Sequence, residues 1–182
     1  MREIEIKLKV NDIDSLETKL KEAGCVFEDS ITQQDVIYSS SVNAGSFDEA
    51  KEGHVAIRIR KEGEKAKLTL KQQKTGEMDN LEYESEIEDI VAIDKILSTL
   101  GWKPEVAVVK TRKQGKLGEY QVCLDGVEQL GNYIELEKIA DEDSDPEKIR
   151  DELLKTLEPF GLTRSDEETK GYDTLIYLKN KK

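Results

Sequence analysis

Charged and apolar residues alternate along the first ten residues of the chain, MREIEIKLKV. A period of two predicts a β-strand with one apolar and one charged face, because successive side chains of a strand point to opposite sides. At least five later segments repeat the scheme, and each carries charges of one sign, either paired glutamates or paired lysines and arginines. Such a charged face is either a solvated surface or the lining of a site for a polyanion and its metal.

The remaining sequence predicts about eight strands and three or four helices. Strands are expected at residues 1–10, 25–39, 54–61, 65–74, 81–87, 105–113, 119–125 and 132–139. Helices are expected at residues 11–23, 91–100 and 146–160, with a short fourth helix at 171–178 and a loop at 40–53. Two passes of strand, helix and strands indicate an α+β fold with one antiparallel sheet.

Two arrangements can cover the apolar face of this sheet. A flat sheet with helices on one side leaves a wide ionic face in solvent, which is the ordinary arrangement for any single strand. An eight-stranded antiparallel β-barrel, with helices packed outside and charges inside, covers the same face and also removes the sheet edges. Charges inside a barrel must then be paired, hydrated or bound to a ligand.

Composition limits the partners and the setting of the protein. A net charge of −12 argues against a nucleic acid or an anionic membrane as the partner. The chain is long enough for one domain, which we expect to span residues 1–182. Cys25 and Cys123 stand alone in apolar contexts, and no apolar run approaches transmembrane length, so we expect a soluble cytoplasmic protein with reduced thiols.

The separation of the two signs of charge indicates a ligand. Lysine and arginine side chains match phosphate oxygens, and arginine does so with two parallel hydrogen bonds. Adjacent glutamates repel each other and therefore suit a hard divalent cation such as Mg²⁺ or Mn²⁺, which prefers oxygen ligands. A metal-bound polyphosphate needs both groups on one surface.

Short motifs follow one another along nearly the whole chain, and together they resemble the CYTH family. This family comprises the triphosphate tunnel enzymes, which include class IV adenylyl cyclases and thiamine triphosphatases. A K-G-Y sequence at residues 170–172 is similar to the family's closing S-Y motif, with Gly171 in place of serine. The other motifs are E-x-E-x-K at residues 3–7, R-x-R at 58–60, L-T-L-K at 68–71, E-x-E around Glu84, K-x-R at 110–112, L-D-x-V at 124–127 and L-G-x-x-x-E-x-E at 130–137.

The resemblance implies a tunnel in which a triphosphate lies along a basic wall and one or two divalent cations lie on an acidic wall. Catalysis would consist mainly of positioning and charge neutralisation at phosphorus. The metal ligands it implies are Glu3, Glu5, Glu135 and Glu137, with Glu84 and Asp125 in support. The phosphate-binding residues it implies are Lys7, which is also the catalytic cation, Arg58, Arg60, Lys71, Lys110 and Arg112.

Three functions fit this pattern. The first is metal-dependent hydrolysis of an inorganic or organic triphosphate, such as tripolyphosphate, ATP or thiamine triphosphate. The second is a class IV adenylyl cyclase that converts ATP to cyclic AMP and pyrophosphate, and the third is a binder of polyphosphate or nucleotide without catalysis. Both acidic pairs are intact, which favours an enzyme. Cyclisation also requires a positioned ribose hydroxyl, and no motif indicates one, so hydrolysis is the preferred interpretation.

Overall fold

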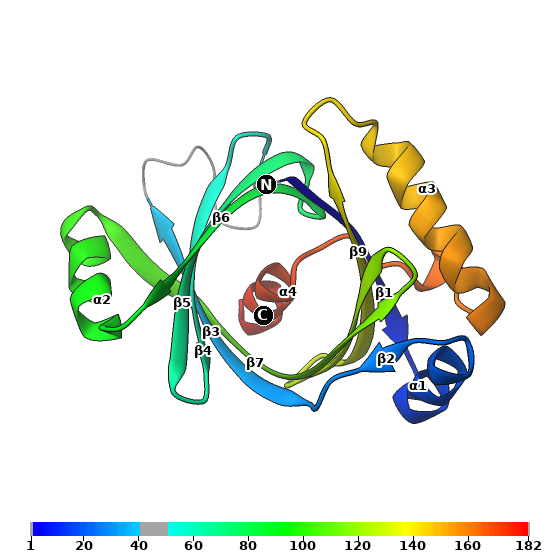
Figure 1. Cartoon of the computed structure of the whole chain (residues 1–182). Coiled ribbons are helices and arrows are strands. Elements are labelled where there is room, and N and C mark those ends of the chain that lie inside the picture. Colours follow the sequence, from blue (N-terminus) through cyan, green and yellow to red (C-terminus); the bar gives the residue numbers. More distant parts are fainter. Residues whose placement is uncertain (1, 41–50, 182) are drawn as a thin grey trace.

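A closed ring of antiparallel strands dominates the computed structural model, which describes residues 2–40 and 51–181 (Figure 1). The strands are β1 (Arg2–Val10), β2 (Val26–Phe27), β3 (Ile31–Ser40), β4 (Val55–Glu62), β5 (Lys65–Gly76), β6 (Asp79–Ile87), β7 (Trp102–Leu117), β8 (Tyr120–Val127) and β9 (Gly131–Ala140). Eight of them form the barrel in the order β7-β3-β4-β5-β6-β1-β9-β8, and β8 pairs again with β7 to close it. The short β2 pairs with β7 outside the ring. The predicted α+β fold with an eight-stranded antiparallel barrel is therefore confirmed.

Four α-helices accompany the strands in the described part of the chain. They are α1 (Ile13–Glu22), α2 (Ile90–Thr99), α3 (Pro146–Leu157) and α4 (Tyr172–Asn180). Asp12, Asp89 and Asp145 cap the first three, each by accepting hydrogen bonds from backbone N–H groups of the first turn. All four lie where the sequence predicts helices. None of the described helices is both long and apolar enough to span a membrane.

Two predicted segments differ from the structure in detail. The extended segment at residues 25–39 divides into β2 and β3. The predicted loop at residues 40–53 lies mostly outside the described residues.

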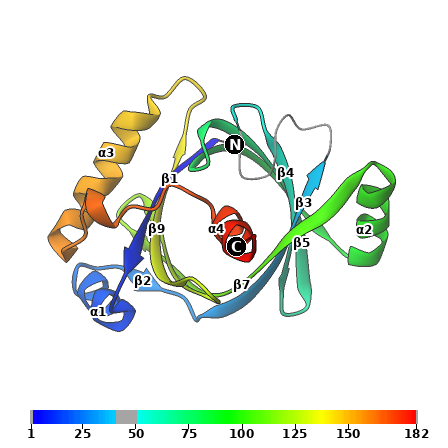
Figure 2. The ribbon, with the colours of Figure 1, turned by 180° about the vertical axis from the view of Figure 1, so that it is seen from behind.

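Three helices cover the outside of the barrel, as expected. Helices α1 and α3 pack through Leu16, Leu20 and Leu153 onto the outward apolar residues of β1, β8 and β9. Helix α2 lies on the opposite side and packs through Leu97 onto β3 and β4. Views from both sides show this arrangement (Figures 1 and 2). The apolar face of the alternating strands is thus removed from water, which is the main stabilising term of such a fold.

Helix α4 is the exception, because it lies within the ring of strands in both views (Figures 1 and 2). The expectation that all helices pack outside is wrong for this element. Tyr172 and Ile176 of α4 contact inward apolar residues of the barrel, among them Ile37 and Val108. At the end of the bore where α4 lies, the inward side chains of β3 and β7 change from ionic to apolar. An apolar helix face there removes these side chains from water.

A glycine on β7 marks where the strands crowd. A Cβ on Gly115 would lie 2.8 Å from Cδ1 of Phe27 and 2.8 Å from the carbonyl oxygen of Val26. We expect Gly115→Ala to lower the free energy of unfolding by about 1–3 kcal/mol in urea denaturation, because β2 must move away from β7. Gly76→Ala is the control, since a Cβ there meets nothing within 4 Å. Equal stability of the two variants would contradict this packing.

Candidate active site

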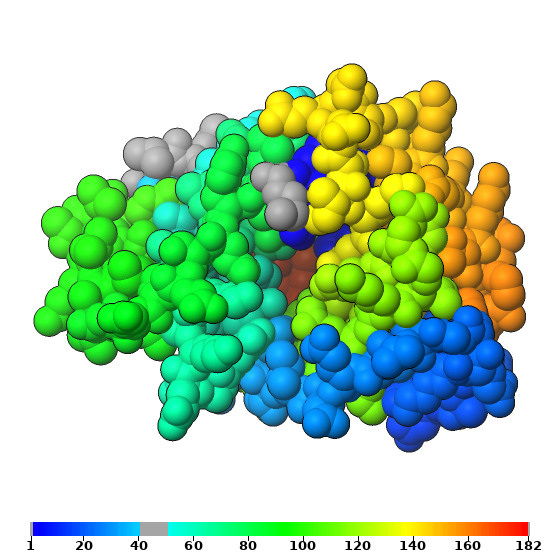
Figure 3. All heavy atoms as spheres, viewed as in Figure 1, coloured from blue at the N-terminus to red at the C-terminus, as the bar shows by residue number. Residues whose placement is uncertain are grey.

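The bore of the barrel holds a cavity of about 350 Å³ that is lined from all eight barrel strands. Its mouth is visible as the central hollow of the space-filling view, with residues of the C-terminal segment (red) at the bottom (Figure 3). Tyr172, Asp173 and Thr174, from the first turn of α4, line the cavity. Helix α4 thus forms part of the wall of this cavity.

An acidic wall, formed by Glu3 and Glu5 of β1 and Glu135 and Glu137 of β9, occupies one side of the cavity. The two strands are antiparallel neighbours, and Glu5 lies directly opposite Glu137. Side chains opposite each other on one face of a sheet lie within contact distance, so this register gathers the carboxylates. Lys7 lies opposite Glu135 and places one cation beside them.

The carboxylates of the acidic wall are crowded and incompletely neutralised. Burial, together with neighbouring carboxylates, raises the pKa of Glu3 to about 7 and that of Glu5 to about 8. Burial and Glu135 raise the pKa of Glu137 to about 7. Glu135 differs: burial would raise its pKa, but Arg112 lies against it and holds that pKa below its usual range. Three of the four carboxylates therefore take up a proton close to neutral pH, where a bound cation would compete with that proton.

Six cations, which we call the basic wall, also line the cavity, and most of them hold a carboxylate partner. Arg60 makes two parallel hydrogen bonds of 2.7 Å to Asp35. Arg112 donates to Asp125 at 2.7 Å and also contacts Glu135. These pairs offset the cost of burying charge in the bore. The wall consists of Lys7, Arg58, Arg60, Lys71, Lys110 and Arg112, and all six line the cavity.

Two cations of the basic wall are less fully neutralised than the others. The Nε of Arg58 is buried without a hydrogen-bond partner, and the guanidinium lies 3.9 Å from Glu82. The ammonium of Lys7 donates to the backbone carbonyl of Lys170 and lies 4.3 Å from the centre of the Tyr172 ring. Neither contact cancels the positive charge, so both side chains remain available to an anion in the cavity.

The two supporting acids named from the sequence occupy different surroundings. Asp125 is fully buried and does not line the cavity, because Lys110, Arg112 and the hydroxyl of Tyr172 surround it. Glu84 lines the cavity and forms an ion pair of 2.8 Å with Lys67. Asp125 thus fixes cations of the basic wall.

The sequence did not assign site roles to several acids that the structure places in the cavity, among them Glu82 and Asp35. Glu82 contacts Lys71 and holds the pKa of that ammonium above its usual range, although burial would lower it. Asp35 anchors Arg60. Glu82 belongs to the same Glu-x-Glu pair as Glu84, so the alternation of the strand could have placed Glu82 on the face that lines the cavity. Asp35 belongs to no motif that would have indicated its position.

Few aromatic groups line the cavity. His54 lies half-buried on the lining, and burial lowers its pKa. Among the described lining residues, only His54 and Tyr172 carry a ring. Trp102 packs outside the barrel beside α2. The cavity therefore resembles a charged channel more than a stacking pocket for a base.

The residues of the acidic wall fit a divalent cation. Glu3 and Glu5 have no hydrogen bond or ion pair to another described side chain, and their carboxylates face the cavity. Oxygen donors without competing partners suit a hard cation such as Mg²⁺ or Mn²⁺. The raised pKa values of these groups point the same way, because crowded carboxylates are stabilised by a shared cation.

Comparisons with known proteins agree with this architecture. A model of the CYTH domain family matches residues 1–172. A protein of Methanocaldococcus jannaschii that is named a candidate adenylate cyclase, MJ0240, is 28% identical over 174 residues, covering 94% of this chain and 97% of that protein. The PH1819 protein of Pyrococcus horikoshii is 30% identical, with a TM-score of 0.80 over 97% of this chain and 99% of that one. The HpAC1 protein of Hippeastrum shares the fold at 18% identity, with a TM-score of 0.61 over 100% of this chain and 96% of that one.

Protonation of the acidic wall predicts how the stability of the metal-free protein changes with pH. The folded state raises the pKa of Glu3, Glu5 and Glu137 to about 7, 8 and 7, so it binds more protons than the unfolded chain from about pH 4.5 to 8. The free energy of unfolding therefore falls as pH rises through this window. We expect a lower Tm near pH 8 than near pH 6.5 in a chelating buffer.

Added Mg²⁺ should raise that Tm more near pH 8 than near pH 6.5, because it binds deprotonated carboxylates. Glu5→Gln should flatten the pH dependence, since it removes the group with the highest of these pKa values. A Tm of the wild-type protein that rises from pH 6.5 to pH 8 would contradict the raised pKa values. So would a Tm of Glu5→Gln that depends on pH as steeply as that of the wild-type protein.

Proposed function

The chain belongs to the CYTH domain family, and we propose that it is a divalent-metal-dependent enzyme that hydrolyses an inorganic or organic triphosphate in its bore. One observation carries the proposal. The four crowded carboxylates of the acidic wall and the six cations of the basic wall line the same cavity. A triphosphate with its metal carries both charges that these two walls complement.

The acidic wall would hold Mg²⁺ or Mn²⁺. Its four glutamates supply oxygen ligands, Glu84 adds charge at the edge of the cavity, and Asp125 supports the wall by fixing Arg112. When bound, the cation would neutralise phosphate charge and activate a water molecule for attack. The family's reported activities, cyclase and triphosphatase, both use a triphosphate, so the metal role is common to them.

The basic wall would orient the phosphates. Arg58 and Lys7 offer charge that the protein leaves incompletely paired, and Lys7 is the cation nearest the acidic wall in the strand register. We assign Lys7 to the phosphoryl group that is transferred. The other four cations of the basic wall would attract the phosphates from fixed positions; they are Arg60, Lys71, Lys110 and Arg112. Because these side chains are already in place, they need not rearrange as negative charge develops on the phosphate in the transition state.

Hydrolysis is favoured over cyclisation by the lining of the cavity. A cyclase must hold an adenine and a ribose hydroxyl, and aromatic faces are the usual support for a base. Here the ring of Tyr172 is covered by Lys7 and Lys110, at 4.3 and 4.9 Å from its centre. The alternative, class IV adenylyl cyclase, draws its support from the name of the Methanocaldococcus relative. The Hippeastrum protein is described as having a dominant triphosphatase activity, which supports hydrolysis.

One assay separates the candidate functions. The protein is incubated with tripolyphosphate, ATP or thiamine triphosphate and Mg²⁺ or Mn²⁺, and phosphate, pyrophosphate and cyclic AMP are measured together. We expect metal-dependent release of phosphate. Cyclic AMP with pyrophosphate would replace our proposal by the cyclase, and tight binding without turnover would replace it by a polyphosphate binder.

Glu5 provides a test of the acidic wall. Glu5→Gln should raise the Mg²⁺ concentration for half-maximal turnover by about 10- to 100-fold, because one carboxylate ligand is lost. Glu86→Gln is the matched control on an exposed position of β6 that does not line the cavity. Turnover of Glu5→Gln with an unchanged Mg²⁺ requirement would exclude Glu5 as a ligand.

Arg58 provides a test of the basic wall. Arg58→Gln should raise KM for the triphosphate by about 10- to 100-fold, since a charge-assisted hydrogen bond contributes about 1.5–3 kcal/mol. Lys61→Gln, on the same strand but exposed, should leave KM unchanged. Equal KM values for the two variants would remove Arg58 from the binding wall.

A further inference from the structure

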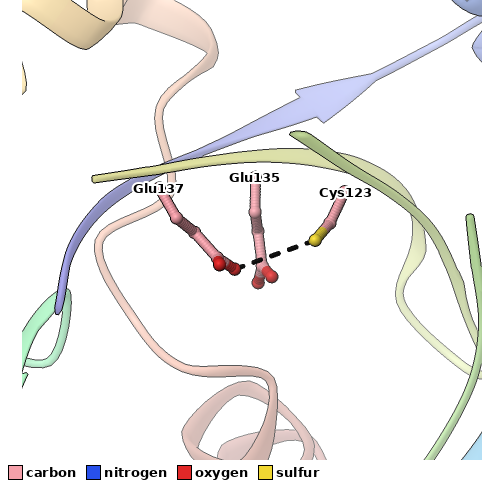
Figure 4. A group of neighbouring side chains, drawn as sticks. All are labelled: Cys123, Glu135 and Glu137. Carbon is pink, nitrogen blue, oxygen red and sulfur yellow. Dashed lines mark hydrogen bonds between the residues drawn. The ribbon is translucent and has the colours of Figure 1, made fainter. Parts of the chain in front are cut away.

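A cysteine stands on the acidic side of the bore, where the proposed function does not use it. Cys123 lies on β8 directly opposite Glu135 of β9, and Glu137 is two residues further along the same face. The thiol and both carboxylates point toward one another (Figure 4). One ligand atom from each of the three side chains lies within 4.8 Å of the others.

The surroundings of Cys123 are polar, in contrast with those of Cys25. The sulfur of Cys123 lies 3.9 and 4.0 Å from the side-chain amide nitrogens of Gln114 and Gln121, and 3.8 Å from Oε1 of Glu137. Cys25 packs in the apolar cluster beneath α1 and α3. Cys25 thus behaves as a small apolar side chain, whereas Cys123 faces groups that ligate cations.

The distance between two of these atoms is close to that in a thiolate-containing metal centre. In a tetrahedral zinc site, bond lengths of about 2.3 Å to sulfur and 2.1 Å to oxygen place the two donor atoms about 3.6 Å apart. The sulfur of Cys123 and Oε1 of Glu137 are already 3.8 Å apart. Arg112 contacts Oε2 of Glu135, which leaves Oε1 of that carboxylate for a cation, and its guanidinium also lies 3.9 Å from Oε1 of Glu137.

We propose that Cys123, Glu135 and Glu137 form a site for a borderline or soft divalent cation, Zn²⁺ or Cd²⁺, with one thiolate and two carboxylate ligands. The thiol gives up its proton to solvent when the metal binds, because the thiolate is the ligand. Three protein ligands leave a fourth position open, as in zinc sites that also bind water or substrate. Magnesium gains nothing from the sulfur, because hard cations prefer oxygen ligands.

The site has a consequence for the metal of the proposed reaction. Glu135 and Glu137 belong to both ligand sets, so Zn²⁺ held by Cys123 competes with Mg²⁺ or Mn²⁺ for the acidic wall. Binding of Zn²⁺ itself does not depend on the proposed hydrolysis.

Cadmium binding to the full-length protein tests the site directly. The metal-free protein is titrated with Cd²⁺ alone in a reducing, chelator-free buffer, while the ultraviolet charge-transfer band of a cadmium–thiolate bond is recorded. We expect the wild-type protein and Cys25→Ser to show the band with one cation per chain, and Cys123→Ser to lack it. Zn²⁺ affinity, measured by calorimetry, should fall at least about 10-fold in Cys123→Ser, while Mn²⁺ affinity stays unchanged.

Two results would overturn the proposal: a thiolate band that persists in Cys123→Ser, or a band that disappears in Cys25→Ser. Circular dichroism of each variant establishes that it is folded, and Glu137→Gln supplies a second variant that should weaken Zn²⁺ binding without touching the thiol. Loss of triphosphate turnover alone would count against the proposed function and leave the Cd²⁺ result standing, so the two proposals fail separately.

Discussion

The closed antiparallel sheet imposes the constraint on which the rest of the molecule depends. Alternating strands in a barrel must send one face inward, and here that face is ionic. Burying so many charges would unfold the protein unless they neutralised one another. The structure meets this requirement with pairs such as Arg60–Asp35 and Arg112–Asp125. Among the described residues of these two walls, neutralisation is least complete at Glu3, Glu5, Lys7 and Arg58, and these are the groups to which we assign the metal and the phosphate.

Helix α4 connects this charged interior to the C-terminal end of the chain. Tyr172 donates a hydrogen bond of 3.0 Å to Asp125, and the ammonium groups of Lys7 and Lys110 lie 4.3 and 4.9 Å from the centre of its ring. Burial and the neighbouring acids raise the pKa of the Tyr172 phenol well above its usual range, so it remains a donor. The apolar end of the bore and its charged centre therefore share one residue. Displacing α4 would alter both the packing of the barrel end and the surroundings of Lys7 and Lys110 of the basic wall.

The alternation of the strands was sufficient to predict which residues share a face, because a period of two determines which side chains share a side. It allowed both a flat sheet and a barrel, and the resemblance to the CYTH family indicated the barrel. Alternation could not predict which strands pair, and the contacts of Asp35 with Arg60 and of Cys123 with Glu137 depend on that pairing. The sequence carried only a weak indication that something apolar, such as α4, occupies the bore. Val106 and Val108 share the inward face with Lys110, and apolar residues there indicate that something apolar fills the bore. Whether that occupant is another strand face, a ligand or a helix depends on the whole fold.

The central claim is that the acidic wall holds a divalent cation beside a triphosphate in the bore. Crystals soaked with Mn²⁺ and tripolyphosphate would test it through the anomalous signal of manganese. The account predicts manganese within ligand distance of the carboxylates of Glu3, Glu5, Glu135 or Glu137, with phosphate density against Lys7 and Arg58. Manganese bound only on the outer surface, for example at the acidic residues 141–147, would contradict it.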